Sequence, residues 1–371
     1  MIDILILYIL TFLILWQFGG YQLLMAIIAT ISKPKEKNYG YQDFVSIIVP
    51  AYNEEKVIEN RIKNLLSLDY PKNKYEIIVV ESGSTDNTSQ IIKDIINNRK
   101  NGTKPEIKLL QEKIRKGKAS AINFGKRYAK GDIILITDAN SIYDEKVLKE
   151  LIPHFENPKV GAVGGRYVIA NPDKTLTSSE SFYRYLEHIM RLGESVIESA
   201  YSLFGTISAF RSKLVEADTT MLAEDLDMTI QVKRKGYRVE YEPKAVAYEN
   251  AAATHRDQIT QNKRILIGHI KCFFKHWKYL LVPIDMYRLI IFPSHRTLRV
   301  LSPFMFLAIP ILYLVIGDTT TIIMHFFFYN SGFCINFWLV DDFKIQDNRT
   351  YKIKHGILSI FNTENSVLCI I

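Results

Sequence analysis

The chain has few cysteines and lacks the nucleotide-binding motifs that are easiest to recognise. Its 371 residues include only three cysteines, an odd number without the spacing of a metal site. This predicts a reduced compartment and gives the thiols no chemical role. No GxGxxG fingerprint follows the first apolar strand pattern, and Arg115-Lys116-Gly117-Lys118 has neither the spacing nor the Ser/Thr of a Walker loop. A nucleotide must therefore be held by other residues.

Two further features are missing from the sequence: a basic N-terminal start and a basic stripe. The first residues, Met-Ile-Asp, lack the basic start of a cleaved signal peptide, and the lysines follow the apolar run 2–31 instead. The net charge of +8 is spread over the chain, with no basic stripe interleaved with aromatic residues. This argues against nucleic acid as a partner. It favours attraction to an anionic membrane surface and to a phosphate-bearing substrate.

Long apolar runs at both ends predict a multi-pass protein of the cell membrane. Residues 1–31 are long enough for a transmembrane anchor, and 300–340 read as a transmembrane hairpin with its basic flanks on one side. Residues 281–299 carry too many interruptions to span and are expected at the interface. The tail 341–371 is expected in the cytosol, with a possible further membrane segment at 356–371. Basic residues after the anchor place the domain between the spans in the cytoplasm.

The middle of the chain, residues 44–280, alternates between strand and helix patterns. This order predicts an α/β domain with a parallel sheet and right-handed crossovers. The predicted strands are 45–50, 75–80, 107–110, 133–136 and 160–163, and the predicted helices include 117–130, 178–199 and 226–236.

The most informative segment is 131–140. Four apolar residues, 133–136, indicate a buried central strand, and Asp138 and Asn140 follow it directly. Their spacing of two puts both side chains on one side of an extended chain at the sheet edge where α/β folds bind ligands. Two oxygen ligands there could hold a divalent cation that bridges a diphosphate. The alternative is a strand followed by a simple Asx turn.

Several short motifs follow one another along roughly residues 44–280. They are Pro50-Ala51-Tyr52-Asn53-Glu54, Glu81-Ser82-Gly83-Ser84-Thr85-Asp86, Gly117-Lys118, Gly131-Asp132, Asp138-Ala139-Asn140, Gly205, Ala223-Glu224-Asp225 and Gln261-Asn262-Lys263-Arg264. Their order resembles that of family 2 glycosyltransferases. The spans on either side resemble the membrane-bound polysaccharide-synthase branch, near cellulose, hyaluronan and poly-N-acetylglucosamine synthases. The resemblance implies an A-type glycosyltransferase fold, Rossmann-like with a mostly parallel sheet, and a nucleoside diphosphate sugar donor, for which a UDP-linked sugar is expected.

The resemblance also implies a role for each site residue. Asp225 would be the general base of an inverting transfer, and Arg264 would stabilise the departing diphosphate. Asp138 and Asn140 would hold Mg²⁺ or Mn²⁺. Gly205 and Glu224 would lie on the acceptor side. The donor would be bound by Ala51, Tyr52, Glu54, Glu81, Lys118, Asp138 and Gln261.

Three positions depart from the family pattern. Glu81-Ser82 replaces the usual Asp-Asp, which leaves the choice of base open. Asn140 replaces the second Asp, and an amide carries one negative charge fewer, so the metal site is expected to be weaker. Ile265 replaces the Trp of QxxRW, which argues against processive polymerisation more than against transfer itself.

Simpler interpretations remain for single residues. Lys118 could be a solvated lysine, and Asp225 could be only a helix cap. Asp227 is expected to compensate the helix dipole. His255, His269 and His276 have no metal spacing and are expected on helix surfaces or at the interface.

The sequence therefore predicts a metal-dependent, membrane-bound hexosyl- or N-acetylhexosaminyltransferase with a glycan or lipid-linked acceptor. The rival from another class is a catalytically silent membrane subunit that keeps the fold for binding or assembly, supported by Asn140 and Ile265. A nucleotidyltransferase is disfavoured because 50–55 contains no glycine for a phosphate loop.

Overall fold

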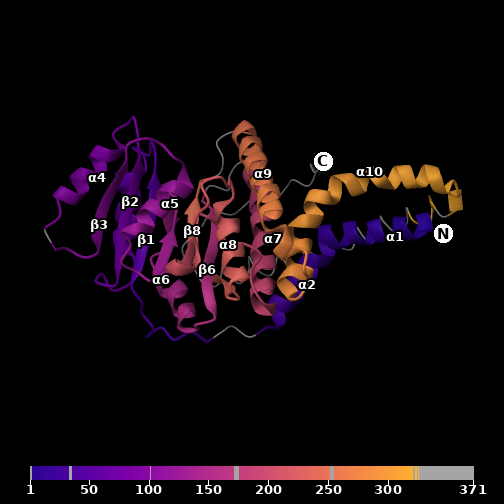
Figure 1. The fold of residues 1–371 in the computed structure, drawn as a ribbon, viewed down its shortest axis with the longest axis horizontal. Helices are drawn as coiled ribbons and strands as arrows, with labels where there is room; N and C mark the ends of the chain where they lie inside the picture. The colour runs from indigo at the N-terminus through magenta and orange to yellow at the C-terminus, as the bar shows by residue number, and fades with distance from the viewer. Residues whose placement is uncertain are drawn as a thin grey trace.

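An eight-stranded sheet forms the centre of the chain in the computed structural model, which describes residues 2–32, 36–100, 102–170, 175–250, 255–320, 322–323 and 325. The strand order is β3-β2-β1-β4-β7-β6-β8-β5 (Figure 1). The strands are β1 Val45–Ala51, β2 Tyr75–Ser82, β3 Glu106–Glu112, β4 Ile133–Ile136, β5 Ile142–Tyr143, β6 Val160–Ile169, β7 Ser208–Arg211 and β8 Arg238–Glu249. The helices are α1 Ile2–Leu15, α2 Tyr21–Ile31, α3 Ile58–Ser67, α4 Thr88–Asn97, α5 Lys118–Arg127, α6 Val147–Leu151, α7 Thr175–Ile197, α8 Glu224–Arg234, α9 His255–Leu280 and α10 Leu298–Ile316.

Both faces of the sheet are covered by helices, as the continuous apolar strands require. Along β1, Ile47 and Val49 pack on one side with residues of α3, α4 and α6. Ile48 points to the other side and packs with residues of α5 and α8. The two hydrophobic cores on the two faces give the α/β sandwich expected from the sequence.

The sheet is mixed, because β7 runs antiparallel between β4 and β6, and β5 runs antiparallel to β8. Neither β7 nor β8 was predicted from the sequence. β8 was not recognised as a strand because Glu240 and Glu242 suggest a solvated segment. Both glutamates are in fact buried, and they contact the two ring nitrogens of His154 at 2.6 and 2.8 Å.

The site lies where the chain changes direction across the sheet. From β1 the chain continues to β2 and β3 on one side, and then crosses back to β4, the parallel neighbour of β1 on the other side. The carboxyl ends of β1 and β4 thus border a topological switch point, the place where open α/β sheets bind ligands. Ala51 ends β1, and Asp138 and Asn140 follow β4.

Gly131 allows β4 to enter the sheet beside β1. A Cβ atom at this position would lie 2.7 Å from the Phe44 carbonyl oxygen and 2.9 Å from the Ser46 backbone nitrogen. Its own backbone N–H donates to the Ser46 hydroxyl at 2.9 Å, and this hydroxyl donates to the buried Glu76 at 2.7 Å. Only glycine fits this approach of two backbones.

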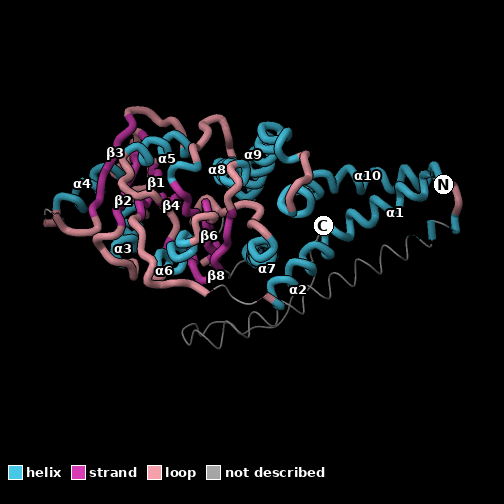
Figure 2. The backbone as a smooth tube through the Cα atoms, turned by 60° about the horizontal axis from the view of Figure 1, so that its bottom comes forward, coloured by secondary structure: helices cyan, strands magenta, loops and turns pink. Residues whose placement is uncertain are grey.

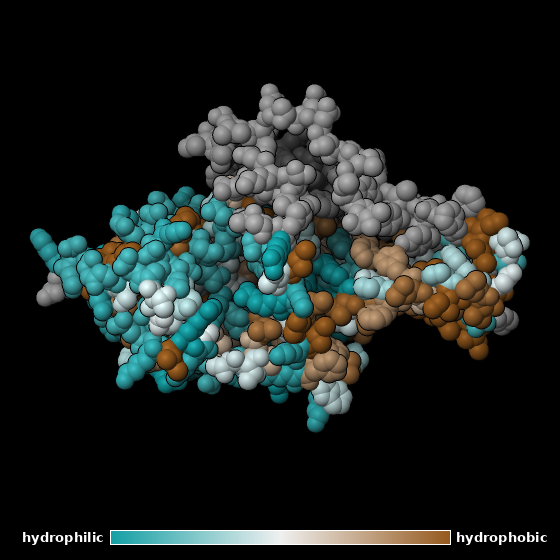
Figure 3. Space-filling model, turned by 90° about the horizontal axis from the view of Figure 1, so that it is seen from above, coloured by the Kyte–Doolittle hydropathy of each residue, from teal (hydrophilic) through white to brown (hydrophobic). Residues whose placement is uncertain are grey.

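Two apolar helical segments project from the domain as a pair (Figures 1 and 2). Ile2–Ile31 and Tyr287–Ile316 are each long and apolar enough to cross a membrane, judged within the part of the chain that is described. Hydrophobic side chains gather on this projection (Figure 3), with Phe304, Leu307 and Leu314 exposed by 68%, 66% and 85%.

The predicted boundary between an interfacial segment and a span is not seen in the helix. Residues expected to lie at the interface, 287–299, are part of the same helical run as Val300–Ile316, through π turns at Tyr287–Ile291 and Pro293–Thr297. Most of the hairpin's second half, 322–340, and the tail 341–371 lie outside the described residues.

The projecting pair is joined to the domain through α2 and α7. A Cβ atom at Gly193 of α7 would lie 2.8 Å from the Met25 Cα atom, so the two helix backbones are in close contact. Beside this contact the Tyr21 hydroxyl donates to the Glu194 carboxylate at 2.7 Å. Tyr21, Met25 and Met190 form a small buried cluster of their own. The α2–α7 contact therefore combines apolar burial with a buried hydrogen bond.

Substitution of Gly131 by alanine is expected to destabilise the domain. The added methyl group meets backbone atoms that cannot move aside, and overpacking of this kind costs about 1–3 kcal/mol of unfolding free energy. Thermal unfolding of the purified chain, followed by circular dichroism, measures the effect. Gly40→Ala is the control, because its Cβ would meet only the Asn38 side-chain oxygen at 3.0 Å. Equal melting temperatures for the two variants would contradict the role of Gly131.

Candidate active site

A cavity of about 910 Å³ opens at the carboxyl edge of β1 and β4. It is lined by residues that the sequence motifs singled out, although they come from six separate parts of the chain. Glu81 is the exception, since it does not line the cavity and is only 4% exposed. The expected site residues that line it are Ala51, Tyr52, Glu54, Lys118, Asp138, Asn140, Gly205, Glu224, Asp225, Gln261 and Arg264.

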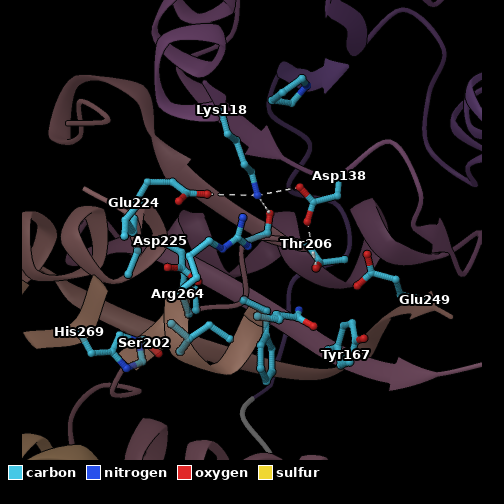
Figure 4. Close-up of a pocket in the computed structure, with 18 of the residues that line it drawn as sticks. Lys118, Asp138, Tyr167, Ser202, Thr206, Glu224, Asp225, Glu249, Arg264 and His269 are labelled. Carbon is cyan, nitrogen blue, oxygen red and sulfur yellow. Dashed lines mark hydrogen bonds and ion pairs between the residues drawn. The ribbon is translucent and has the colours of Figure 1, made fainter. Parts of the chain in front are cut away.

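Lys118 lies at the centre of the site, at the first turn of α5 (Figure 4). Its ammonium group is 2.6 Å from the Asp138 carboxylate and 3.2 Å from the Glu224 carboxylate. Burial alone would lower the pKa of Lys118, but the two carboxylates outweigh burial and raise it. The lysine therefore stays charged and is not the solvated residue of the simpler interpretation.

Asp225 faces the same cavity from the first turn of α8. Its burial and the neighbouring charge of Glu224 raise the pKa of Asp225 to about 6, although Lys118 opposes the shift. One carboxylate oxygen accepts the Leu226 backbone N–H at 2.8 Å. Asp225 is thus a carboxylate that can take up a proton near neutral pH and also satisfies one N–H group of the helix start.

The opposite wall of the cavity is built from the loops after β1 and β2. Asn53 has a φ of 54° and does not cap a helix, because α3 begins only at Ile58. Its side chain accepts the Thr85 backbone N–H at 2.9 Å and joins the two loops. Glu81 accepts the Ser84 N–H from below, so it braces this turn. The Tyr52 ring faces the cavity and is covered by the Arg115 guanidinium, 4.1 Å from its centroid.

Comparison with known protein families shows which family contains this chain. A family model described as glycosyl transferase family group 2 matches residues 133–339, more than half of the chain. The chain belongs to this family. The model described as glycosyl transferase family 2 matches residues 46–217, which contain β1, β4 and Lys118. The expectation of a family 2 glycosyltransferase is confirmed.

Curated relatives and a solved structure agree with the family. Poly-beta-1,6-N-acetyl-D-glucosamine synthase of Staphylococcus epidermidis is 28% identical over 210 residues, which are 55% of this chain and 49% of the relative. The synthase of Staphylococcus aureus strain COL is 28% identical over 225 residues, 59% of this chain and 53% of the relative. The chain thus spans about half the length of these relatives.

The mannosyltransferase PcManGT from Pyrobaculum calidifontis, solved with GDP-Man and Mn²⁺, has the same fold. The TM-score is 0.68 at 23% identity, and the match covers 90% of this chain and 96% of that chain. The expected A-type glycosyltransferase fold is confirmed.

The family 2 cavity contains a set of oxygen ligands suited to a divalent cation. Asp138 accepts the Thr206 hydroxyl at 3.3 Å, and the Asn140 side chain donates to Glu249 at the end of β8. Burial and the charge of Asp138 raise the pKa of Glu249. Carboxylate and amide oxygens are the ligands that Mg²⁺ and Mn²⁺ prefer, so the residues fit a cation at this edge. Glu249 was not predicted to be a site residue, because the strand that it ends, β8, was not predicted either.

A second group of potential ligands, Asp227, Cys272 and His276, does not fit a metal. Asp227 is fully buried and is already bound by His276 at 2.8 Å and by Lys275 at 2.7 Å. Arg234 contacts the other ring nitrogen of His276 at 3.2 Å. Lys275 and Arg234 already place two positive charges beside this group, so a metal cation there would be electrostatically unfavourable. The network instead joins α8 to α9. The expectation of a surface His276 is wrong, because its side chain is buried. Asp227 lies in the first turn of α8 as expected, and it is also bound by side chains of α9.

Conversion of Asn140 to aspartate is expected to strengthen binding of Mn²⁺ by the purified chain. The change adds one negative charge to the ligand set while keeping the side-chain size, whereas Glu249→Gln removes one and should weaken binding. Free Mn²⁺ measured by electron paramagnetic resonance gives the affinity without any turnover. Asn262→Asp, in the same cavity but on α9, is the control for added charge. If Asn140→Asp and Asn262→Asp bind Mn²⁺ alike, Asn140 does not belong to the cation site.

Proposed function

We propose that the chain is a membrane-bound, inverting glycosyltransferase. It moves a sugar from a nucleoside diphosphate donor to a hydroxyl group of a glycan or lipid-linked acceptor. The observation that carries the proposal is the Asp225 carboxylate, with its pKa raised to about 6, in the cavity that also contains Lys118 and Asp138. Family membership supports the reaction class. The two apolar helical segments support placement in the membrane, with the domain on the cytoplasmic side.

In the donor half of the cavity, each residue has a distinct task. Ala51, Tyr52 and Glu54 surround the space for the nucleoside at the end of β1. Lys118 supplies positive charge for the diphosphate at the start of α5, where the helix N-terminus adds to the field. A divalent cation held by Asp138 and Asn140 would neutralise charge on the leaving diphosphate. Arg264 lines the cavity from α9, and its planar fork suits the same phosphate oxygens.

Asp225 acts on the acceptor. Its carboxylate takes the proton of the acceptor hydroxyl as this oxygen forms a bond to the anomeric carbon. The bond between that carbon and the diphosphate oxygen breaks on the opposite face, and the diphosphate leaves with the electron pair. Inversion at the anomeric carbon follows, and no covalent sugar-enzyme intermediate is needed.

Asp225→Asn is expected to reduce transfer by about 10²–10⁴-fold, the contribution typical of a general base. The amide keeps the size of the side chain, so donor affinity and folding should stay close to those of the native chain. Transfer rate and nucleotide-sugar affinity are measured on the same membrane preparation, over a panel of labelled donors. The control is Asp218→Asn, an acid that lies outside the cavity and pairs with Lys275 at 2.7 Å. Transfer within a few-fold of native by Asp225→Asn would refute the base assignment.

The transfer rate is also expected to depend on pH with an acid limb near pH 6. Asp225 must be ionised to accept a proton, and its pKa is raised to about 6, so the rate should fall about tenfold per unit below that pH. Glu224→Gln removes the charge that raises this pKa, so it should move the limb to lower pH. Rate–pH profiles at saturating donor measure the shift. An acid limb that stays in place, or moves to higher pH, would show that a different group titrates.

A further inference from the structure

The cavity has a second, basic end that the donor does not use. Beyond Asp225, on the side away from Lys118, lie Ser202 and His269 (Figure 4). The cavity wall in this part comes from α7 and from the first turns of the Tyr287–Ile316 helix. Its basic residues are Arg184, Arg191, Arg296 and Arg299.

The acids at this end are already shared between several cations. Glu187 is 3% exposed, contacts Arg191, and is 3.1 Å from both Arg299 and His295. Arg191 also donates to the Ser202 carbonyl oxygen at 2.9 Å. Glu187 is therefore already occupied by other cations and does not pair with Arg296.

Arg296 has little compensation within the described residues. One guanidinium nitrogen donates to the Tyr183 hydroxyl at 3.4 Å, and no carboxylate of the described chain pairs with it. Its Nε atom is buried and has no hydrogen-bond partner there. The Nδ1 atom of His269 is likewise buried and unpaired. Burial, and to a lesser extent the charge of Arg296, lowers the pKa of His269 to about 2. Partly desolvated guanidinium groups with open donors bind anions, and their geometry suits phosphate.

The position of Arg296 and Arg299 identifies the kind of molecule that carries this anion. Both lie at the domain end of a helix whose following residues, from Val300 to Ile316, are apolar. Leu301, Phe304 and Leu307 in these turns are exposed by 44%, 68% and 66%. A phosphate held by the arginines would thus have its hydrocarbon chain beside an apolar helix surface, and a sugar on the phosphate would extend towards Asp225.

Resting on the proposed function, we propose that this end of the cavity binds the phosphate of a lipid-linked acceptor. Arg296 and Arg299 hold the phosphate, and Arg184, stacked 4.6 Å from the Tyr167 ring centroid, adds charge at its side. The acceptor class is accordingly a glycan or sugar joined through phosphate to a long-chain lipid, and a free glycan without the phosphate is a poor substitute.

The test is binding of defined lipids to the full chain in neutral detergent, measured by native mass spectrometry. The probes are a polyisoprenyl phosphate, the polyisoprenol of the same length, phosphatidylglycerol and inorganic phosphate. The native chain is expected to bind the polyisoprenyl phosphate at least tenfold more tightly than the polyisoprenol. Arg296→Gln should remove most of this difference, because it takes away a charge-assisted hydrogen bond to the phosphate.

Matched variants separate the site from general charge effects. Arg288→Gln removes an arginine of the same helical run that pairs with Asp285 at 2.8 Å and does not line the cavity, so it should leave the preference intact. Arg296→Lys keeps the charge and should keep part of the preference. Melting temperature shows whether each variant folds, and the comparison of phosphate with alcohol in the native chain stands even if a variant does not.

Three results would overturn the proposal: equal binding of the polyisoprenyl phosphate and the polyisoprenol, equal competition by phosphatidylglycerol, or equal competition by inorganic phosphate. The second would indicate a general phospholipid site and the third a site for free phosphate. The binding assay needs no turnover, so it can detect the lipid phosphate even if Asp225→Asn leaves transfer unchanged. A failure of the lipid-site proposal is therefore distinguishable from a failure of the proposed function.

Discussion

The structure depends on holding several carboxylates close together in a partly buried cavity. Asp138 comes from the end of β4, Glu224 and Asp225 from the start of α8, and Glu249 from the end of β8. Their elements are fixed by two hydrophobic cores, so mutual repulsion cannot be relieved by moving apart. Lys118 offsets part of this repulsion. Burial, together with the neighbouring charges of Glu224 and Asp138, raises the pKa values of Asp225 and Glu249. A cationic ligand is therefore favoured near Asp138, and a proton is favoured on Asp225.

Local sequence patterns were sufficient to predict the alternating strands and helices of the parallel part of the sheet. The buried runs of β1, β2 and β4 and the polar residues that follow them predicted the sheet edge and most of its cavity. Lys118 and Asp138 are brought together as the motif order implied, because parallel strands deliver their ends to one edge. The resemblance to family 2 supplied the role proposed for Asp225, a residue that composition alone would assign to a helix cap.

The remaining residues could not be predicted, because their partners are far away in sequence. Asp227 reads as an ordinary first-turn acid until His276, 49 residues later, is seen to bind it. Glu249 ends a strand whose buried glutamates resemble a solvated segment, and their partner His154 lies on another element. The 287–299 segment looks too polar for a membrane helix. Its His295 and Arg299 in fact face Glu187 of α7, so these polar side chains point towards the domain and its cavity.

The contact between α2 and α7 has a consequence for substrate size. Gly193 lies against the Met25 backbone, and the Tyr21 to Glu194 hydrogen bond lies beside it, so the domain and the helix pair are in direct contact here. For a chain whose helices lie in a bilayer, Asp225 is then held at a constant height above the lipid surface. An acceptor anchored in the same bilayer reaches it only if its reactive hydroxyl stands at that height. Under the proposed function, the length of the acceptor would therefore matter as well as its chemistry.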